Sequence, residues 1–207
     1  MNEMLSDTAL LLVESLNEFM HPAGLFYEGI LAVARKNGCL TNLPELARRA
    51  RGHILVVYAP IGFTPGHPEL KDRTGVLARV KARNALVRGS FGARFFGEME
   101  PEPSDIVLTD RRGISAFHGS DLDRLLRERA VRRIAVGGFL TNVCVESSVR
   151  SAYDFGYEVT VIRDATACLS NEEQVFCETR ILPNFARVIG AGEFLAEIGN
   201  ARLGRSL

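Results

Sequence analysis

Short apolar runs recur along the chain, and stretches with the spacing of amphipathic helices separate several of them. The runs are rich in β-branched residues, as buried strands are. We predict six strands, at residues 9–13, 54–59, 105–109, 133–138, 158–162 and 186–190. Near-continuous apolar strands that alternate with helices predict an α/β fold in which a central, mostly parallel six-stranded sheet lies between two layers of helices.

Five segments have the periodicity of helices, at residues 41–51, 120–130, 144–155, 172–182 and 192–198. Thr41 or Asn42 could cap the first, Ser120 could cap the second, and Gly156 is a usual stop for the third. The chain has no internal repeat and no linker, so its 207 residues fit one domain that spans residues 1–207.

The predicted sheet gathers three chemically interesting residues at one edge. Ligands bind outside the carboxyl ends of the strands in open parallel sheets, where Glu14, Arg111 and Cys144 follow three different strands. Cys144 comes where a strand has ended and a helix begins, so unpaired N–H groups and the helix dipole can lower a thiol pKa below about 8.5. The same N–H groups can hold an oxyanion. The alternative is that Cys144 is a small packing residue.

Glu14 and Arg111 could support a nucleophilic thiol. Such a thiol needs a proton acceptor and cationic support, which a carboxylate and a guanidinium supply. The two residues could equally form a plain structural ion pair. We interpret Cys39, Cys168 and Cys177 as packing residues, because each lies within or beside apolar patterning.

Composition narrows the function. Lys+Arg and Asp+Glu both number 25, so nothing favours nucleic acid or an anionic membrane as partner. No apolar run approaches the roughly 20 residues of a membrane span, and the first residues do not resemble a secretory signal, so we expect a cytoplasmic protein. The cysteines lack CxxC pairing and the histidines lack ligand spacing, so we expect no metal and no cofactor.

Three stretches carry a resemblance to a known family: ALLLVESLNEFMHPAG, the block from SDIVLTDRRGISAF through GGFLTNVCVES to VIRDATA, and RVIGAGEFLAEI. Together they resemble the isochorismatase-like cysteine hydrolases, which include nicotinamidases and N-carbamoylsarcosine amidohydrolase. The resemblance implies that family's fold and hydrolysis of a small amide, ureido or carbamoyl C–N bond through a covalent intermediate. It also implies a small-molecule substrate and a homo-oligomer.

The family uses an aspartate, a lysine and a cysteine. By motif the cysteine is Cys144 and the aspartate position holds Glu14. The lysine position holds Arg111 when counted back from Phe117, but Asp110 when counted forward from Asp105. Glutamate is one methylene longer, and arginine presents a planar fork that stays protonated. These departures imply an altered substrate range, weakened activity or a binding protein without efficient chemistry. A redox-sensing thiol is a third reading.

The resemblance also implies details of substrate binding. The family has a cis peptide before the threonine of its turn, here Phe139–Leu140, and the amides of Leu140 and Cys144 would form the oxyanion hole. Phe19, Phe63 and Phe117 are candidates for the substrate site, although each could be a plain core residue. The Asp-x-His metal arrangement of the nicotinamidases is missing from YAPIGFTPGHPEL, where His67 looks like a loop residue.

Overall fold

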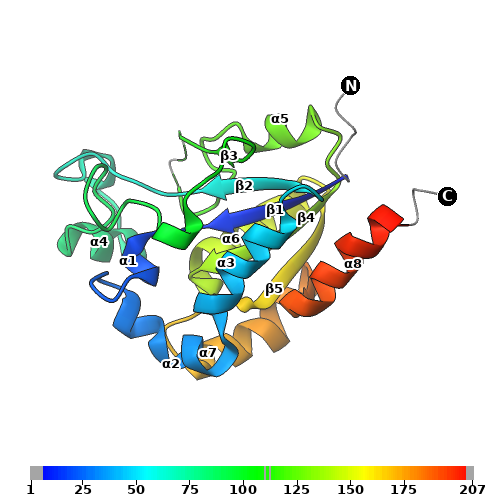
Figure 1. Cartoon of the computed structure of the whole chain (residues 1–207). Coiled ribbons are helices and arrows are strands. Elements are labelled where there is room, and N and C mark those ends of the chain that lie inside the picture. The colour runs from blue at the N-terminus through cyan, green and yellow to red at the C-terminus, as the bar shows by residue number, and fades with distance from the viewer. Residues whose placement is uncertain (1–6, 110, 112, 204–207) are drawn as a thin grey trace.

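The structure, a computed structural model, describes residues 7–109, 111 and 113–203, the last four by their backbone alone. One sheet occupies the centre of the molecule (Figure 1). Its strands are β1 (Thr8–Val13), β2 (Leu55–Ala59), β3 (Ile106–Val107), β4 (Arg133–Phe139), β5 (Glu158–Ala167) and β6 (Arg187–Ile189). They lie in the order β3-β2-β1-β4-β5-β6 with every pairing parallel, so the predicted α/β fold is confirmed.

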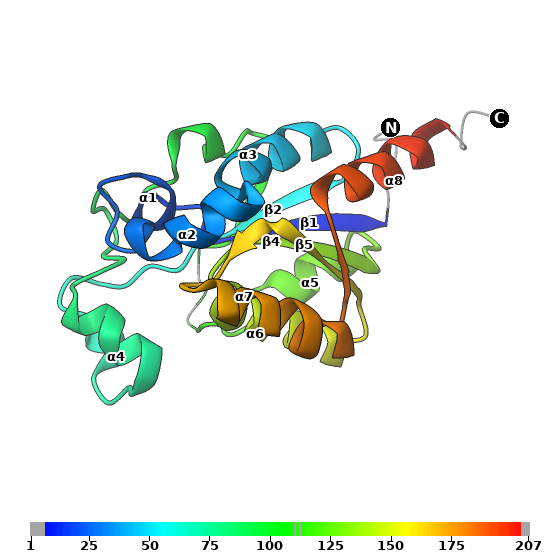
Figure 2. The same ribbon diagram turned by 90° about the horizontal axis from the view of Figure 1, so that it is seen from below.

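Helices cover both faces of this sheet. The α-helices are α1 (Asn17–Met20), α2 (Tyr27–Asn37), α3 (Cys39–Ala50), α4 (Gly75–Ala82), α5 (Leu122–Arg127), α6 (Glu146–Asp154), α7 (Asn171–Phe176) and α8 (Ala191–Leu203). Two π-helical segments, η3 (Thr141–Val145) and η4 (Cys177–Ile181), join α6 and α7 respectively. Seen along the sheet, α2, α3 and α8 lie on one face and α5 and α6 on the other (Figure 2).

Strand β1 shows why the sequence reads as an uninterrupted apolar run. Leu10 and Leu12 pack into the core on the α3 face, and Ala9, Leu11 and Val13 pack into the core on the α6 face. All six residues of β1 are buried, because a central parallel strand has helices on both sides.

Several local predictions differ from the structure. Helix α5 begins at Leu122 with Asp121 as its N-cap, so Ser120 is not the cap. Helix α3 begins at Cys39 after a left-handed Gly38, so neither Thr41 nor Asn42 caps it. The side chain of Asn42 donates instead to the carbonyls of Asn37 and Asp164. Helices α2 and α4 were not predicted. A glycine interrupts the first turn of α2, and α4 begins with a glycine and is too short for a clear helical periodicity.

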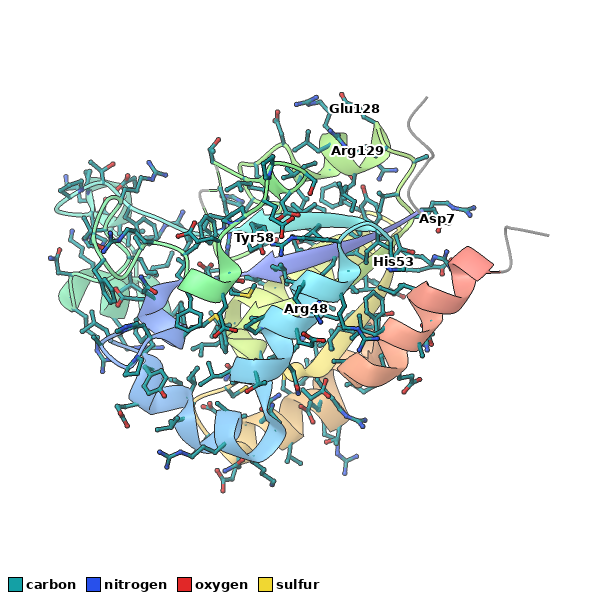
Figure 3. All side chains as sticks on the ribbon, in the orientation of Figure 1. Asp7, Arg48, His53, Tyr58, Glu128 and Arg129 are labelled. Carbon is teal, nitrogen blue, oxygen red and sulfur yellow. The ribbon has the colours of Figure 1, made fainter. Side chains whose placement is uncertain are left out.

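The strand order creates a switch point between β1 and β4. The chain builds outward from β1 through β2 to β3, then returns to the other side of β1 and continues from β4 to β6. Ligands bind in the crevice at such a point. The arrowheads of β1 and β2 point toward α1 and α4 (Figure 1), and Asp7 lies at the opposite end of the sheet (Figure 3).

Within the described residues, no helix combines the length and the apolar character needed to cross a bilayer.

Candidate active site

The ends of β1 and β4 approach each other closely. Val13 pairs with Gly138, which has a φ of +119°. A Cβ at Gly138 would lie 1.8 Å from the carbonyl oxygen of Val13, so only glycine fits here. The next residue after β1, Glu14, has a left-handed φ of +56°, an uncommon conformation for a residue with a side chain. The close approach places Glu14 beside the strand that leads to Cys144.

The Glu14 side chain is fully buried. Its Oε2 accepts the N–H of Ile61 at 2.9 Å, and its Oε1 lies 2.6 Å from Nη1 of Arg111. Within the described part of the chain, Oε1 has no aligned hydrogen bond, so it can still accept a proton. Burial raises the pKa of Glu14 above its usual range, and Arg111 and the Ile61 N–H offset only part of that rise. A raised pKa makes this carboxylate a better proton acceptor.

Arg111 is held by carbonyl oxygens as well as by Glu14. Its Nε donates to the carbonyl of Gly113 at 2.9 Å, its Nη1 to that of Ala59 at 2.5 Å, and its Nη2 to that of Ile114. Burial opposes the charge, but Glu14 and the Cys144 sulfur outweigh it, so the pKa of Arg111 lies above its usual value. The guanidinium therefore has a fixed orientation and keeps its charge.

Cys144 lies in η3, where the chain leaves β4. It is half-buried, whereas Cys39, Cys168 and Cys177 are buried. Burial, and then the Glu14 carboxylate, raise the pKa of the Cys144 thiol to about 12, against the lowering effect of Arg111. The prediction of a depressed thiol pKa is therefore wrong. The position of Cys144 in the sequence suggested that a helix dipole would lower the thiol pKa. In the folded chain, desolvation and the neighbouring Glu14 carboxylate raise it instead.

These three residues form one coupled group. The thiol interacts with both the Glu14 carboxylate and the Arg111 guanidinium. Burial and the Glu14 carboxylate both favour the protonated form of this sulfur.

The turn that carries Cys144 closes on the carbonyl of Leu140, which accepts the N–H groups of Val143 at 3.1 Å and Val145 at 3.2 Å. The peptide bond between Phe139 and Leu140 is cis. Leu140 and Cys144 both line the cavity described next.

A cavity of about 500 Å³ opens at this edge of the sheet. Glu14 and Cys144 are among its lining residues, and apolar side chains form most of its wall: Phe19, Leu25, Phe26, Ile61, Phe63, Val76, Leu77, Val80, Leu86, Ile114, Leu140, Val143 and Leu169. Glu28, Arg79, Arg83 and Glu173 add charged groups. An apolar cavity with a few polar groups in its wall is typical of small-molecule sites.

The predicted aromatic residues separate into two groups. Phe19 and Phe63 line the cavity, and Phe19 stacks on Phe26 at 5.1 Å and on Phe139 at 5.6 Å. Phe139 is fully buried behind Phe19 and supports the wall without lining it. The structure does not bring Phe117 to this cavity, because it packs against Phe155 and Tyr157 in the core on the α6 face.

Two further candidates have different outcomes. Asp110, the alternative to Arg111, lies outside the described residues. His67 is buried, and its Nε2 lies 2.7 Å from the carbonyl of Ala85, so it ties two loops together. Among the residues that the structure describes, no three His, Cys, Asp or Glu side chains are grouped so that they could hold a metal ion.

The sequence did not predict the contacts to Glu14 and Arg111, or the part of the cavity wall, that come from residues outside the family motifs. The N–H of Ile61 and the carbonyl of Ala59 lie at the end of β2, and the contribution of α4 to the cavity wall comes from a short apolar pattern, GVLARVKA. The end of β2 could have been predicted to lie at the site, because ligands bind at the carboxyl ends of the strands. Backbone groups carry no sequence signal.

Comparisons with known proteins agree with this geometry. The chain matches the Isochorismatase domain over residues 8–193. It is 31% identical over 175 residues to the ureidoacrylate amidohydrolase RutB of Variovorax paradoxus (strain S110), which covers 78% of this chain and 69% of that protein.

Two solved structures have the same fold at 26% sequence identity. A cysteine hydrolase from Pseudomonas syringae pv. phaseolicola 1448A has a TM-score of 0.77, with 94% of this chain and 93% of that one covered. The N-carbamoylsarcosine amidase of Thermoplasma acidophilum has a TM-score of 0.68, with 89% and 96% covered.

The fold and the cavity define a small-molecule hydrolase of the α/β class. The chain belongs to the isochorismatase family, as its resemblance implied. Within that family it is an enzyme of the amidohydrolase type, which acts on amide or ureido C–N bonds outside peptides.

Proposed function

We propose that this protein hydrolyses a small amide, ureido or carbamoyl compound through a covalent intermediate on Cys144. Glu14 is the proton acceptor and donor, Arg111 stabilises the charge on Glu14 and on sulfur, and the amides of Leu140 and Cys144 hold the oxyanion. Ureidoacrylate, the substrate in the name of a relative, is the first compound to test.

The chemistry balances with these groups alone. The Cys144 sulfur attacks the carbonyl carbon while its proton moves to Glu14. The C–N bond breaks and the leaving nitrogen takes that proton, which leaves a thioester-type intermediate. Water then attacks, giving one proton to Glu14, and the released sulfur recovers that proton as the acid departs. Each step has one bond formed and one broken at the same carbon.

The observation that carries this proposal is the coupling of Glu14, Arg111 and Cys144 beside an apolar cavity of about 500 Å³, which Glu14 and Cys144 line. A buried ion pair alone would fit a structural role. Contact with the one half-buried cysteine of the four, at the switch point of the sheet, supports a catalytic role.

The test is Cys144→Ala, compared with Cys39→Ala as a matched control. We expect the first variant to lose at least about 10³-fold in kcat, in line with the removal of a nucleophile, and the control to keep activity. Iodoacetamide should modify Cys144 before the other cysteines, because the other three are buried. Unchanged turnover by Cys144→Ala would end this mechanism.

A second candidate is a binding protein that has lost efficient chemistry. The raised thiol pKa and the carbonyl contacts of Arg111 favour it, because both stabilise an unreactive ground state. The double variant Glu14→Asp/Arg111→Lys separates the two functions. If it is more active on simple amides by orders of magnitude, the natural residues have tuned the site away from amidase chemistry. If it is less active, Glu14 and Arg111 are the working pair.

A further inference from the structure

Gln174 lies in α7, and its side chain bonds to Thr141, the first residue of the turn that carries Cys144. It is 5% exposed and uses its whole hydrogen-bonding capacity inside the protein. Its Oε1 accepts the hydroxyl of Thr141 at 2.9 Å and the backbone N–H of Cys168 at 2.7 Å. Its Nε2 donates to Thr166 Oγ1 at 3.3 Å and to Glu178 Oε1 at 2.6 Å.

These contacts define the direction of each bond. A backbone N–H can only donate, so the atom that faces Cys168 must be the amide oxygen. The Thr141 hydroxyl must then donate to that same oxygen, and the amide nitrogen must face Thr166 and Glu178. A buried network in which every group has a partner allows one arrangement, because any rotation leaves an unpaired group.

The network connects the ends of two strands. Phe139 of β4 pairs with Ala167 of β5, and Gln174 bonds to the residues that follow, Thr141 and Cys168. Thr141 is fully buried and is the first residue of η3, between Leu140 and Cys144. Thr141 therefore belongs to the same turn as the two amides that the proposed function assigns to the oxyanion.

We propose that Gln174, acting through Thr141, is a positioning residue that sets the oxyanion-binding amides of Leu140 and Cys144. This inference rests on the proposed function. Gln174 touches neither substrate nor sulfur, and it acts by holding the turn in the position at which both amides can reach one oxygen atom. Small displacements of such donors cost large factors in rate.

The experiment compares hydrolysis with alkylation. Hydrolysis of ureidoacrylate or of 4-nitrophenyl acetate passes through an oxyanion, whereas alkylation of Cys144 by iodoacetamide occurs at a tetrahedral carbon and forms none. Substitution of a residue that positions the amides should slow hydrolysis and leave the rate of alkylation unchanged. A residue that only stabilises the fold should affect both or neither.

Thr141→Val removes the hydroxyl and keeps the shape, and Gln174→Met removes both ends of the amide. For each we expect kcat to fall about 10- to 100-fold, near the lower end of the loss for one oxyanion donor, with KM and the alkylation rate within about threefold of wild type. Thr141→Ser should restore kcat. The kcat of the double variant should lie within about threefold of the kcat of the less active single variant, since the two residues share one interaction.

Thr179→Val makes the same chemical change at an exposed position beyond α7 and should leave both reactions unchanged. The inference is overturned if Thr141→Val keeps wild-type kcat, if hydrolysis and alkylation fall together, or if the two single effects multiply. Thr141→Val decides the matter if Gln174→Met does not fold. Full turnover by Cys144→Ala would instead remove the proposed function.

Discussion

The end of the sheet and the segment from Ile61 to Gly97 each form part of the wall of one cavity, and different interactions hold them. At the sheet, β1 pairs with β4 from Thr8 to Val13, and the whole of β1 is buried. Within that segment, the eight residues of α4 contribute a single buried side chain, Val80. Figure 2 shows α4 set apart from the layers around the sheet.

If the proposed function holds, we expect this difference to separate the residues that perform the chemistry from those that select the substrate. Glu14 and Cys144 follow paired strands, so ladder hydrogen bonds and core packing on both faces fix their separation. Val76 and Leu77 lie on a short helix with few buried contacts, a region that can change without loss of the core. We expect substitutions at the sheet edge to change kcat and stability, and substitutions on α4 to change KM and substrate preference.

The largest expected effect is that of Glu14→Gln. The change keeps the shape of the side chain and removes the proton acceptor, so kcat should fall by about 10²- to 10⁴-fold, as for loss of a general base. Steady-state kinetics would measure it, with the exposed Glu45→Gln on α3 as control. A loss below tenfold would mean that another group accepts the proton.

Arg111→Met should have the largest effect on stability. It leaves the buried Glu14 carboxylate without its cation and the carbonyls of Ala59, Gly113 and Ile114 without a donor. Breaking a buried pair in this way costs about 3–5 kcal/mol, which urea unfolding would measure. Arg124→Met, which removes an exposed arginine from its pairs with Asp121 and Glu128, should leave the unfolding midpoint nearly unchanged. Equal effects would contradict the proposed role of burial.

The pH dependence should show the raised pKa of Glu14. Glu14 accepts a proton only as a carboxylate, and burial raises its pKa, so kcat/KM should fall as pH decreases through that raised value. The fall should be about tenfold per pH unit, with a midpoint above the ordinary glutamate value of about 4.3. A pH–rate profile over the acid range tests this. A midpoint at or below the ordinary value would place Arg111 in control of the carboxylate instead.

The smallest effect should come from the α4 part of the cavity wall. Leu77→Ala on α4 should raise KM by about tenfold, at the lower end of the loss for a methylene contact in an apolar pocket, and leave kcat nearly unchanged. Leu125→Ala is a matched control, because Leu125 is also partly buried but packs on the α6 face. Its KM should not change. An equal effect of both variants on KM would remove the distinction between the two parts of the wall.

Much of the site could be predicted from the chain, because strand ends in a parallel sheet fall on one edge. The apolar runs indicated β1 and β4, and the residues after them, Glu14 and Cys144, do meet there. The position of Phe117 could not be predicted, because whether a side chain faces the cavity or the core depends on the path of an irregular loop.

The amino-acid sequence by itself determined the α/β architecture, the family and the carboxylate, guanidinium and thiol that follow three strand ends, since these follow from local periodicity and short motifs. Only the tertiary structure decided the protonation of that thiol and the groups that hold the turn. Burial, the carbonyls around Arg111 and the amide of Gln174 bring together residues far apart in the chain. Desolvation and buried hydrogen bonds exist only once the chain has packed.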